Sequence, residues 1–136
     1  MRHLLFSKIH TTVVSTIIAS SLASCAISPE TQAKMDEYTR TIPTCSSDSD
    51  CAVKWAAARA WVVVNSDFII QGDSDTRLFA SNTLPSQSGI GAIVDRVATG
   101  AGNYQIVVDL ECFSVYSCPG LWDSKIDFNR TVNNAR

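Results

Sequence analysis

Histidine is almost missing from this chain of 136 residues, because the only two are His3 and His10. Histidine is the most common general base in enzymes and a frequent metal ligand. Beyond residue 10 the chain therefore cannot form a Ser-His-Asp or Cys-His site of its own. A Ser-x-x-Lys pair is absent as well. We expect a protein that is not an enzyme.

The chain also lacks an apolar run long enough for a membrane-spanning helix, which takes about 20 residues. Its Val- and Ile-rich stretch, residues 11–23, contains six Ser or Thr residues and follows the basic residues Arg2 and Lys8. A basic start, an apolar middle and small residues at the end are typical of a secretory signal. We predict that residues 1–24 are a cleaved signal peptide.

Positive charge is scarce in the remaining chain. Residues 25–136 carry nine Lys and Arg against thirteen Asp and Glu, a formal charge of −4, and no basic cluster. We therefore expect no nucleic-acid partner. These 112 residues suffice for one domain with one core, and no internal repeat is visible.

The signal-like stretch ends with Leu22, Ala23, Ser24 and Cys25. These residues resemble the lipobox of Gram-negative bacterial lipoproteins, in which the cysteine receives diacylglycerol and becomes the first residue. The resemblance implies a lipid anchor at Cys25, with palmitate as an acyl group. In that family an Asp after the cysteine often marks inner-membrane retention, and here Ala26 implies the periplasmic face of the outer membrane. The alternative is an ordinary signal peptide cleaved near a cysteine.

Four further cysteines are Cys45, Cys51, Cys112 and Cys118. An even number in an exported chain predicts two disulfides. Neighbouring partners are separated by five residues in both pairs, which favours Cys45–Cys51 and Cys112–Cys118. A bond between Cys51 and Cys112 is the competing arrangement, because both are predicted to face the core. Zinc sites usually have closer Cys pairs, so we expect neither metal nor cofactor.

The polar segment 25–44 contains Pro29 and Pro43. We interpret it as a lipidated flexible tether with a helical tendency only at residues 32–40. Residues 45–136 are predicted to form a single small α+β domain.

Within this domain the acidic, Ser-rich segment 46–50 precedes an amphipathic helix over residues 51–64. The last three residues of this segment, 62–64, favour strand conformation, which predicts that the helix ends before residue 64. Period-two patterns then predict strands. The fold class that we expect is one N-terminal helix on a four-stranded antiparallel meander, with a possible short C-terminal helix near residues 123–132. The four predicted strands are residues 68–71, 76–81, 92–98 and 104–112.

The best candidate for partner binding is the aromatic, disulfide-constrained segment 113–122, with Phe113, Tyr116 and Trp122. Alternatively, these side chains cap the open end of a small core. The pair Asp109 and Glu111 could superficially suit a glycosidase. A solvated face paired with Arg77 or Arg96 is the simpler interpretation.

Together these features predict a non-enzymatic binding or envelope-assembly module, held at the membrane by its lipid. It would bind a protein or another envelope component through its sheet edge or the 113–122 loop. The alternative is a protective inhibitor, an immunity protein or an exclusion lipoprotein, for example one acting against a lysozyme-type hydrolase. That alternative rests on architectural analogy.

Overall fold

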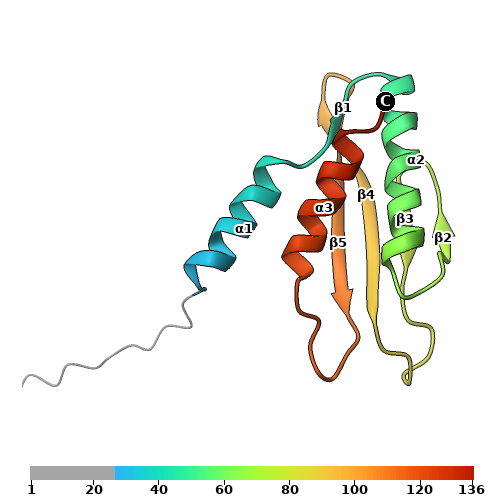
Figure 1. Ribbon diagram of the computed structural model, residues 1–136. Helices are drawn as coiled ribbons and strands as arrows, with labels where there is room; N and C mark the ends of the chain where they lie inside the picture. The colour runs from blue at the N-terminus through green and yellow to red at the C-terminus, as the bar shows by residue number, and fades with distance from the viewer. Residues whose placement is uncertain (1–26) are drawn as a thin grey trace, which may run out of the picture.

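The computed structural model describes residues 27–136, so the predicted signal peptide and Cys25 lie outside the described residues. Residues 27–136 form three helices and a five-stranded antiparallel sheet, with α2 and α3 on one face of the sheet (Figure 1). The α+β class is confirmed, whereas the prediction of one helix and four strands is wrong. The elements are α1 (Pro29–Arg40), β1 (Thr44–Cys45), α2 (Asp48–Asn65), β2 (Gly72–Asp73), β3 (Arg77–Ala80), β4 (Ile90–Gly100), β5 (Asn103–Cys112) and α3 (Leu121–Asn133).

The strand order is β1-β5-β4-β3-β2, so the last four strands along the chain form the expected meander. The remaining strand, β1, was not predicted and pairs with β5 through Thr44 and Cys45. The carbonyl of Pro43 extends this pairing by accepting a hydrogen bond from the amide of Ile106 at 2.9 Å. A two-residue strand has no periodicity to recognise, which explains why the sequence did not predict β1.

The hairpin before β4 is displaced from its predicted position. β2 occupies Gly72–Asp73, where a turn was expected, and residues 68–71 are not a strand. Gly72 pairs with Phe79, whose ring occupies the space that a Cβ at Gly72 would need. The chain then turns at Ser74, whose Oγ accepts the Arg77 amide at 3.0 Å.

The hairpin between β4 and β5 turns at Ala101 and Gly102, with φ of 50° and 76°. Positive φ at both positions matches the right-handed twist of paired strands. The alternation expected along β5 is confirmed at its centre, because Ile106, Val108 and Leu110 are buried.

Helix α2 begins earlier and ends later than predicted. The Ser47 side chain caps it by accepting the Asp50 amide at 3.2 Å, and acidic residues in the first turn suit the helix dipole. The β-prone residues 62–64 stay helical because Trp61 and Val62 are buried in the core. Packing thus outweighs their weak local preference.

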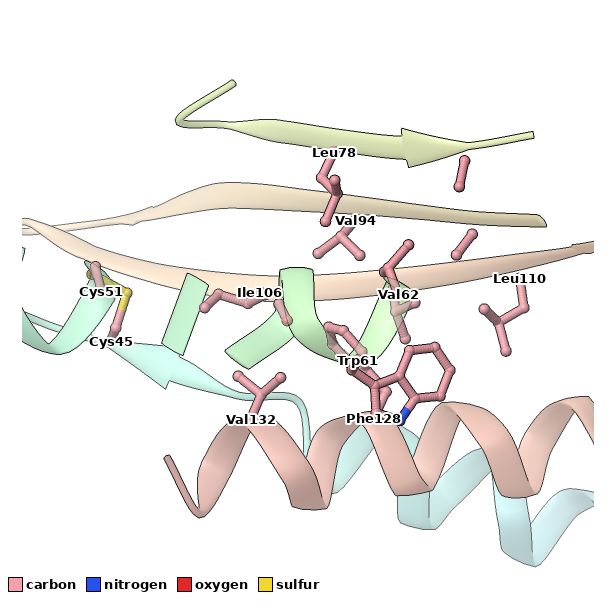
Figure 2. Packing of buried hydrophobic residues seen from close by; sticks show 14 residues of the cluster. Cys45, Cys51, Trp61, Val62, Leu78, Val94, Ile106, Leu110, Phe128 and Val132 are labelled. Carbon is pink, nitrogen blue, oxygen red and sulfur yellow. A yellow bond between two sulfur atoms is a disulfide. The ribbon is translucent and has the colours of Figure 1, made fainter. Parts of the chain in front are cut away.

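The C-terminal helix α3 is longer than expected and completes the helical layer. Ile126 and Val132 of this helix are buried. The Phe128 and Trp61 rings pack edge-on, with 5.3 Å between the ring centres. The Trp61 indole donates a hydrogen bond to the Asp127 carboxylate at 2.8 Å. Figure 2 shows Trp61, Phe128 and Val132 between the sheet and α3.

Helix α1 occupies the segment for which we expected a flexible tether. Ser28 caps it by accepting the Thr31 amide at 3.1 Å, Pro29 fits the first turn, and Glu30 suits the dipole. The helix packs against α3. The ordered chain therefore starts well before Cys45.

Both disulfides join neighbouring cysteines, as favoured by their spacing. Cys45 bonds to Cys51 and links β1 to the first turn of α2. Cys112 bonds to Cys118 and closes the segment after β5. The competing bond between Cys51 and Cys112 is therefore excluded.

Candidate binding surfaces

Asp109, one of the two carboxylates considered for a glycosidase, is held in an ion pair. The Asp109 carboxylate accepts a hydrogen bond from Lys125 Nζ at 2.7 Å and, contrary to expectation, does not pair with Arg77 or Arg96. Asp73, which lies in β2, pairs with Arg59. Within residues 27–136 no group of three His, Cys, Asp or Glu side chains could hold a metal ion. Asp109 and Glu111 thus share a strand face without forming a recognisable acid-base site.

A hollow of about 450 Å³ lies beside α2. Trp55, Arg59, Asp75 and Arg96 are among its lining residues. The Arg96 guanidinium stacks 4.1 Å from the centre of the Tyr104 ring. Because both signs of charge line the hollow, its electrostatics single out neither anionic nor cationic ligands.

The three aromatic residues predicted to bind a partner do not form one patch. Phe113 lies against Gly91, and its ring meets Phe68 edge-on at 5.5 Å. Trp122 belongs to α3 and meets the Tyr38 ring at 5.8 Å. Only Tyr116 extends into solvent. Phe113 and Trp122 therefore pack within the domain, and Tyr116 alone is free for contact.

The tip of the 113–117 loop presents Val115 and Tyr116, both almost fully exposed. Cys112–Cys118 closes the loop, and the Ser114 hydroxyl accepts the Tyr116 amide at 3.2 Å. Ser117 has φ of 71°, a left-handed conformation that turns the chain back. The disulfide limits the freedom of this loop, so a ligand would order it at reduced entropic cost.

Hydrogen bonds attach the C-terminal half of α1 to the domain. The Tyr38 hydroxyl donates a hydrogen bond to the Val108 carbonyl at 2.8 Å. Val108 belongs to the part of β5 that does not pair with β1. Asn129, fully buried on α3, donates to the Tyr38 carbonyl at 2.9 Å and to Thr41 Oγ1 at 3.1 Å. We refer to Tyr38, Thr41, Val108 and Asn129 as the α1 latch.

Ion pairs add to the latch and define the direction of α1. Lys34 Nζ lies 3.0 Å from Asp123, and Arg130 lies 2.7 Å from Glu37. Residue numbers rise together along the two helices, so α1 and α3 run parallel. Burial raises the pKa of Tyr38, and the nearby charge of Asp109 raises it further.

The sheet face away from α2 and α3 carries a row of apolar side chains. The cross-strand partners Phe79 and Ile93 lie on this face with Val97 and Val107. Phe79 and Val97 are exposed, while Ile93 and Val107 are half-buried. Arg77 and Asp95 form an ion pair of 3.4 Å beside them. We call Phe79, Ile93, Val97 and Val107 the open sheet face.

Neither the latch nor the open sheet face was predicted from the sequence. A Ser-Pro-Glu start at residues 28–30 is a helix signal that was available. The role of Asn129 had no such signal, because its partners are about 90 residues away in sequence. Asp95 lies between Ile93 and Val97 on one strand face. This pattern suggested a polar, solvent-exposed face, so the apolar residues on it were not recognised as a candidate surface.

Comparisons with protein-family models, curated proteins and solved structures find no match to this chain. Among residues 27–136, none of the helices combines the length and apolarity needed to cross a membrane.

Proposed function

We propose that this protein is an outer-membrane-anchored periplasmic lipoprotein that acts as a non-enzymatic binding module. The lipobox-like residues 22–25 support the anchor. The open sheet face is the observation that carries the binding role. Four apolar side chains share a sheet face that α2 and α3 leave uncovered (Figure 1). Apolar side chains left uncovered on one face often mark a protein-binding site.

The partner that fits this face is a folded protein with a flat, largely apolar surface. A sheet face offers area without the concave, enclosed shape that small ligands need. The Arg77–Asp95 ion pair lies within this face, because Asp95 stands between Ile93 and Val97 on β4 and pairs with Val107. Protein interfaces combine apolar side chains with polar groups of this kind.

An added strand at the sheet edge is a poorer fit than we expected from the sequence. The two edge strands, β1 and β2, have two residues each and offer little backbone for pairing. Beyond β1, the Tyr38 hydroxyl already occupies the Val108 carbonyl. The proposed interface therefore lies on the open sheet face.

Site-specific photocrosslinking in the native envelope tests this proposal. A photoreactive residue at Phe79 or Val97 is expected to capture one defined protein. The same residue at Val53, which is also partly exposed but lies on α2, provides the control. Equal capture from Val53, or no capture from any position, would argue against the proposed interface.

Binding of the purified captured protein provides the quantitative test. The substitution Val97→Arg is expected to weaken binding about tenfold or more, equivalent to about 1.4 kcal/mol. Val53→Arg is expected to leave affinity unchanged, and both variants should unfold at the wild-type urea midpoint. Lysozyme inhibition that depends on Tyr116 would instead favour the protective inhibitor.

A further inference from the structure

Several loops converge at one end of the domain, which we call the loop end. It comprises the start of α1, the last turn of α2, and residues 66–71, 81–89 and 113–120. The Asp67 amide bonds to the Ile90 carbonyl at 3.0 Å, and the Phe113 amide bonds to Gly89 at 2.8 Å. The pair Lys34–Asp123 places α1 beside the start of α3. In Figure 1 these loops point downward, opposite β1 and the C-terminus.

The loop end carries the most exposed large apolar side chains of residues 27–136. Val64, Ile69, Val115 and Tyr116 are 80%, 82%, 92% and 90% exposed. Ile27 and Leu84 at the same end are more than half exposed. Val53 and Val97, toward the other end, are only 39% and 46% exposed. Separate segments thus expose apolar side chains at one end of the domain.

Cys25 is close to this end in sequence. It precedes the helix cap Ser28 by three residues, and an extended chain covers at most about 3.6 Å per residue. Three residues of chain span at most about 11 Å. Because the latch holds α1 against α3, a lipid on Cys25 would keep the loop end near the headgroups.

We propose that the loop end is a membrane-contacting face, with the side chains of Ile69, Val115 and Tyr116 entering the lipid interface. This inference rests on the proposed lipid anchor. Valine and isoleucine gain free energy when they leave water, and a tyrosine ring suits the interface because its hydroxyl stays hydrated. The open sheet face then stands beside the membrane, accessible to its partner.

The charges of the loop end indicate that any bilayer surface would suffice. Lys34 is engaged by Glu30 at 3.2 Å and by Asp123 at 3.0 Å. Glu30 itself is exposed. Attraction to anionic lipid requires available Lys or Arg side chains. Contact is therefore expected to depend little on anionic lipid.

Fluorescence quenching of the full-length mature protein in phosphatidylcholine vesicles tests this orientation. The variants Tyr116→Trp and Ile69→Trp each add one indole at the loop end, and Val97→Trp is the matched control. Brominated acyl chains should quench most of the fluorescence of the tryptophans introduced at residues 116 and 69. Aqueous acrylamide should instead quench the tryptophan introduced at residue 97. The emission of the native tryptophans is subtracted with wild-type protein.

Mass spectrometry of the same preparations separates the two proposals. If Cys25 is lipidated but residues 116 and 69 respond to acrylamide as residue 97 does, the membrane face is refuted and the anchor stands. If Cys25 carries no lipid, the proposed anchor fails. Vesicle-bound protein with lipid-quenched residues 116 and 69 would then still support the face, and its failure to bind vesicles would refute it. A wild-type urea midpoint shows that each variant is folded.

Discussion

Asn129 is the buried polar residue on which attachment of α1 depends. Its amide donates to the Tyr38 carbonyl and to Thr41 Oγ1, so one side chain joins α3 to the end of α1. We expect Asn129→Ala to lower the free energy of unfolding by about 1–3 kcal/mol, because it removes two hydrogen bonds that are each worth about 0.5–1.5 kcal/mol. Urea unfolding measures the change. The exposed Asn134→Ala is the control, and equal effects would contradict the latch.

Tyr38 gives the latch a dependence on pH. Its pKa is raised above the ordinary value of 10.0 because burial disfavours the phenolate and Asp109 repels it. The unfolded chain therefore loses this proton first as pH rises. The stability from Tyr38 is present in full below pH 10 and is lost as pH rises through the folded pKa.

Unfolding measured from pH 9 to pH 11 checks this expectation. Wild-type stability should fall more steeply than that of Tyr38→Phe, which has no proton to lose. Tyr116→Phe is the control, because its ring is exposed and outside the latch. Identical pH slopes for wild type and Tyr38→Phe would contradict the assigned role.

At the scale of elements, the two disulfides differ in accessibility although each separates its cysteines by six positions. Cys45 and Cys51 are buried, whereas Cys112 is exposed. Thiolate attack requires access to the sulfur. We expect dithiothreitol to reduce Cys112–Cys118 first in the folded protein, as measured by timed alkylation and peptide mapping. Earlier reduction of Cys45–Cys51 would contradict the described burial.

The contact between α2 and α3 provides a second test at this scale. Phe128 is fully buried against Trp61. We expect Phe128→Ala to cost about 3–5 kcal/mol in urea unfolding. Phe79→Ala, on the partly exposed sheet face, is expected to cost about 1–2 kcal/mol. Equal costs would contradict the assignment of Phe128 to the core and Phe79 to the open face.

Elements with a strong local pattern were the predictable part of the fold. The Ser-capped segment before Cys51 and the alternation from Tyr104 to Cys112 indicated α2 and β5. β1 was not predictable, because two residues supply no period and their pairing depends on β5. α1 was underestimated because its few apolar side chains suggested a tether, although Ser28 and Pro29 signal a helix start.

The candidate site was less predictable than the fold, since it depends on which side chains remain uncovered. Tyr116 and Trp122 look equivalent in sequence, yet only Tyr116 is exposed, because Tyr38 of α1 packs against Trp122. Spacing indicated that Asp109 and Glu111 share a strand face, but could not reveal that Lys125 of α3 pairs with Asp109. Such contacts depend on how distant elements pack.

At the scale of the whole molecule, the domain has two surfaces with separate proposed roles. The loop end gathers exposed apolar side chains and includes the start of α1, which follows Cys25 closely in sequence. The open sheet face carries Phe79, Ile93, Val97 and Val107. The latch connects these roles, because a docked α1 turns a lipid anchor into a defined orientation. Loss of the latch is therefore expected to loosen membrane contact at Tyr116 without removing the lipid.

We propose above all that a lipid on Cys25 anchors the chain. Mass spectrometry of the protein extracted from native membranes tests it most directly. We expect the mature chain to begin at Cys25, with diacylglycerol and a further acyl chain on this residue, and both neighbour disulfides to be intact. An unmodified Cys25, within a chain that begins elsewhere, would contradict it.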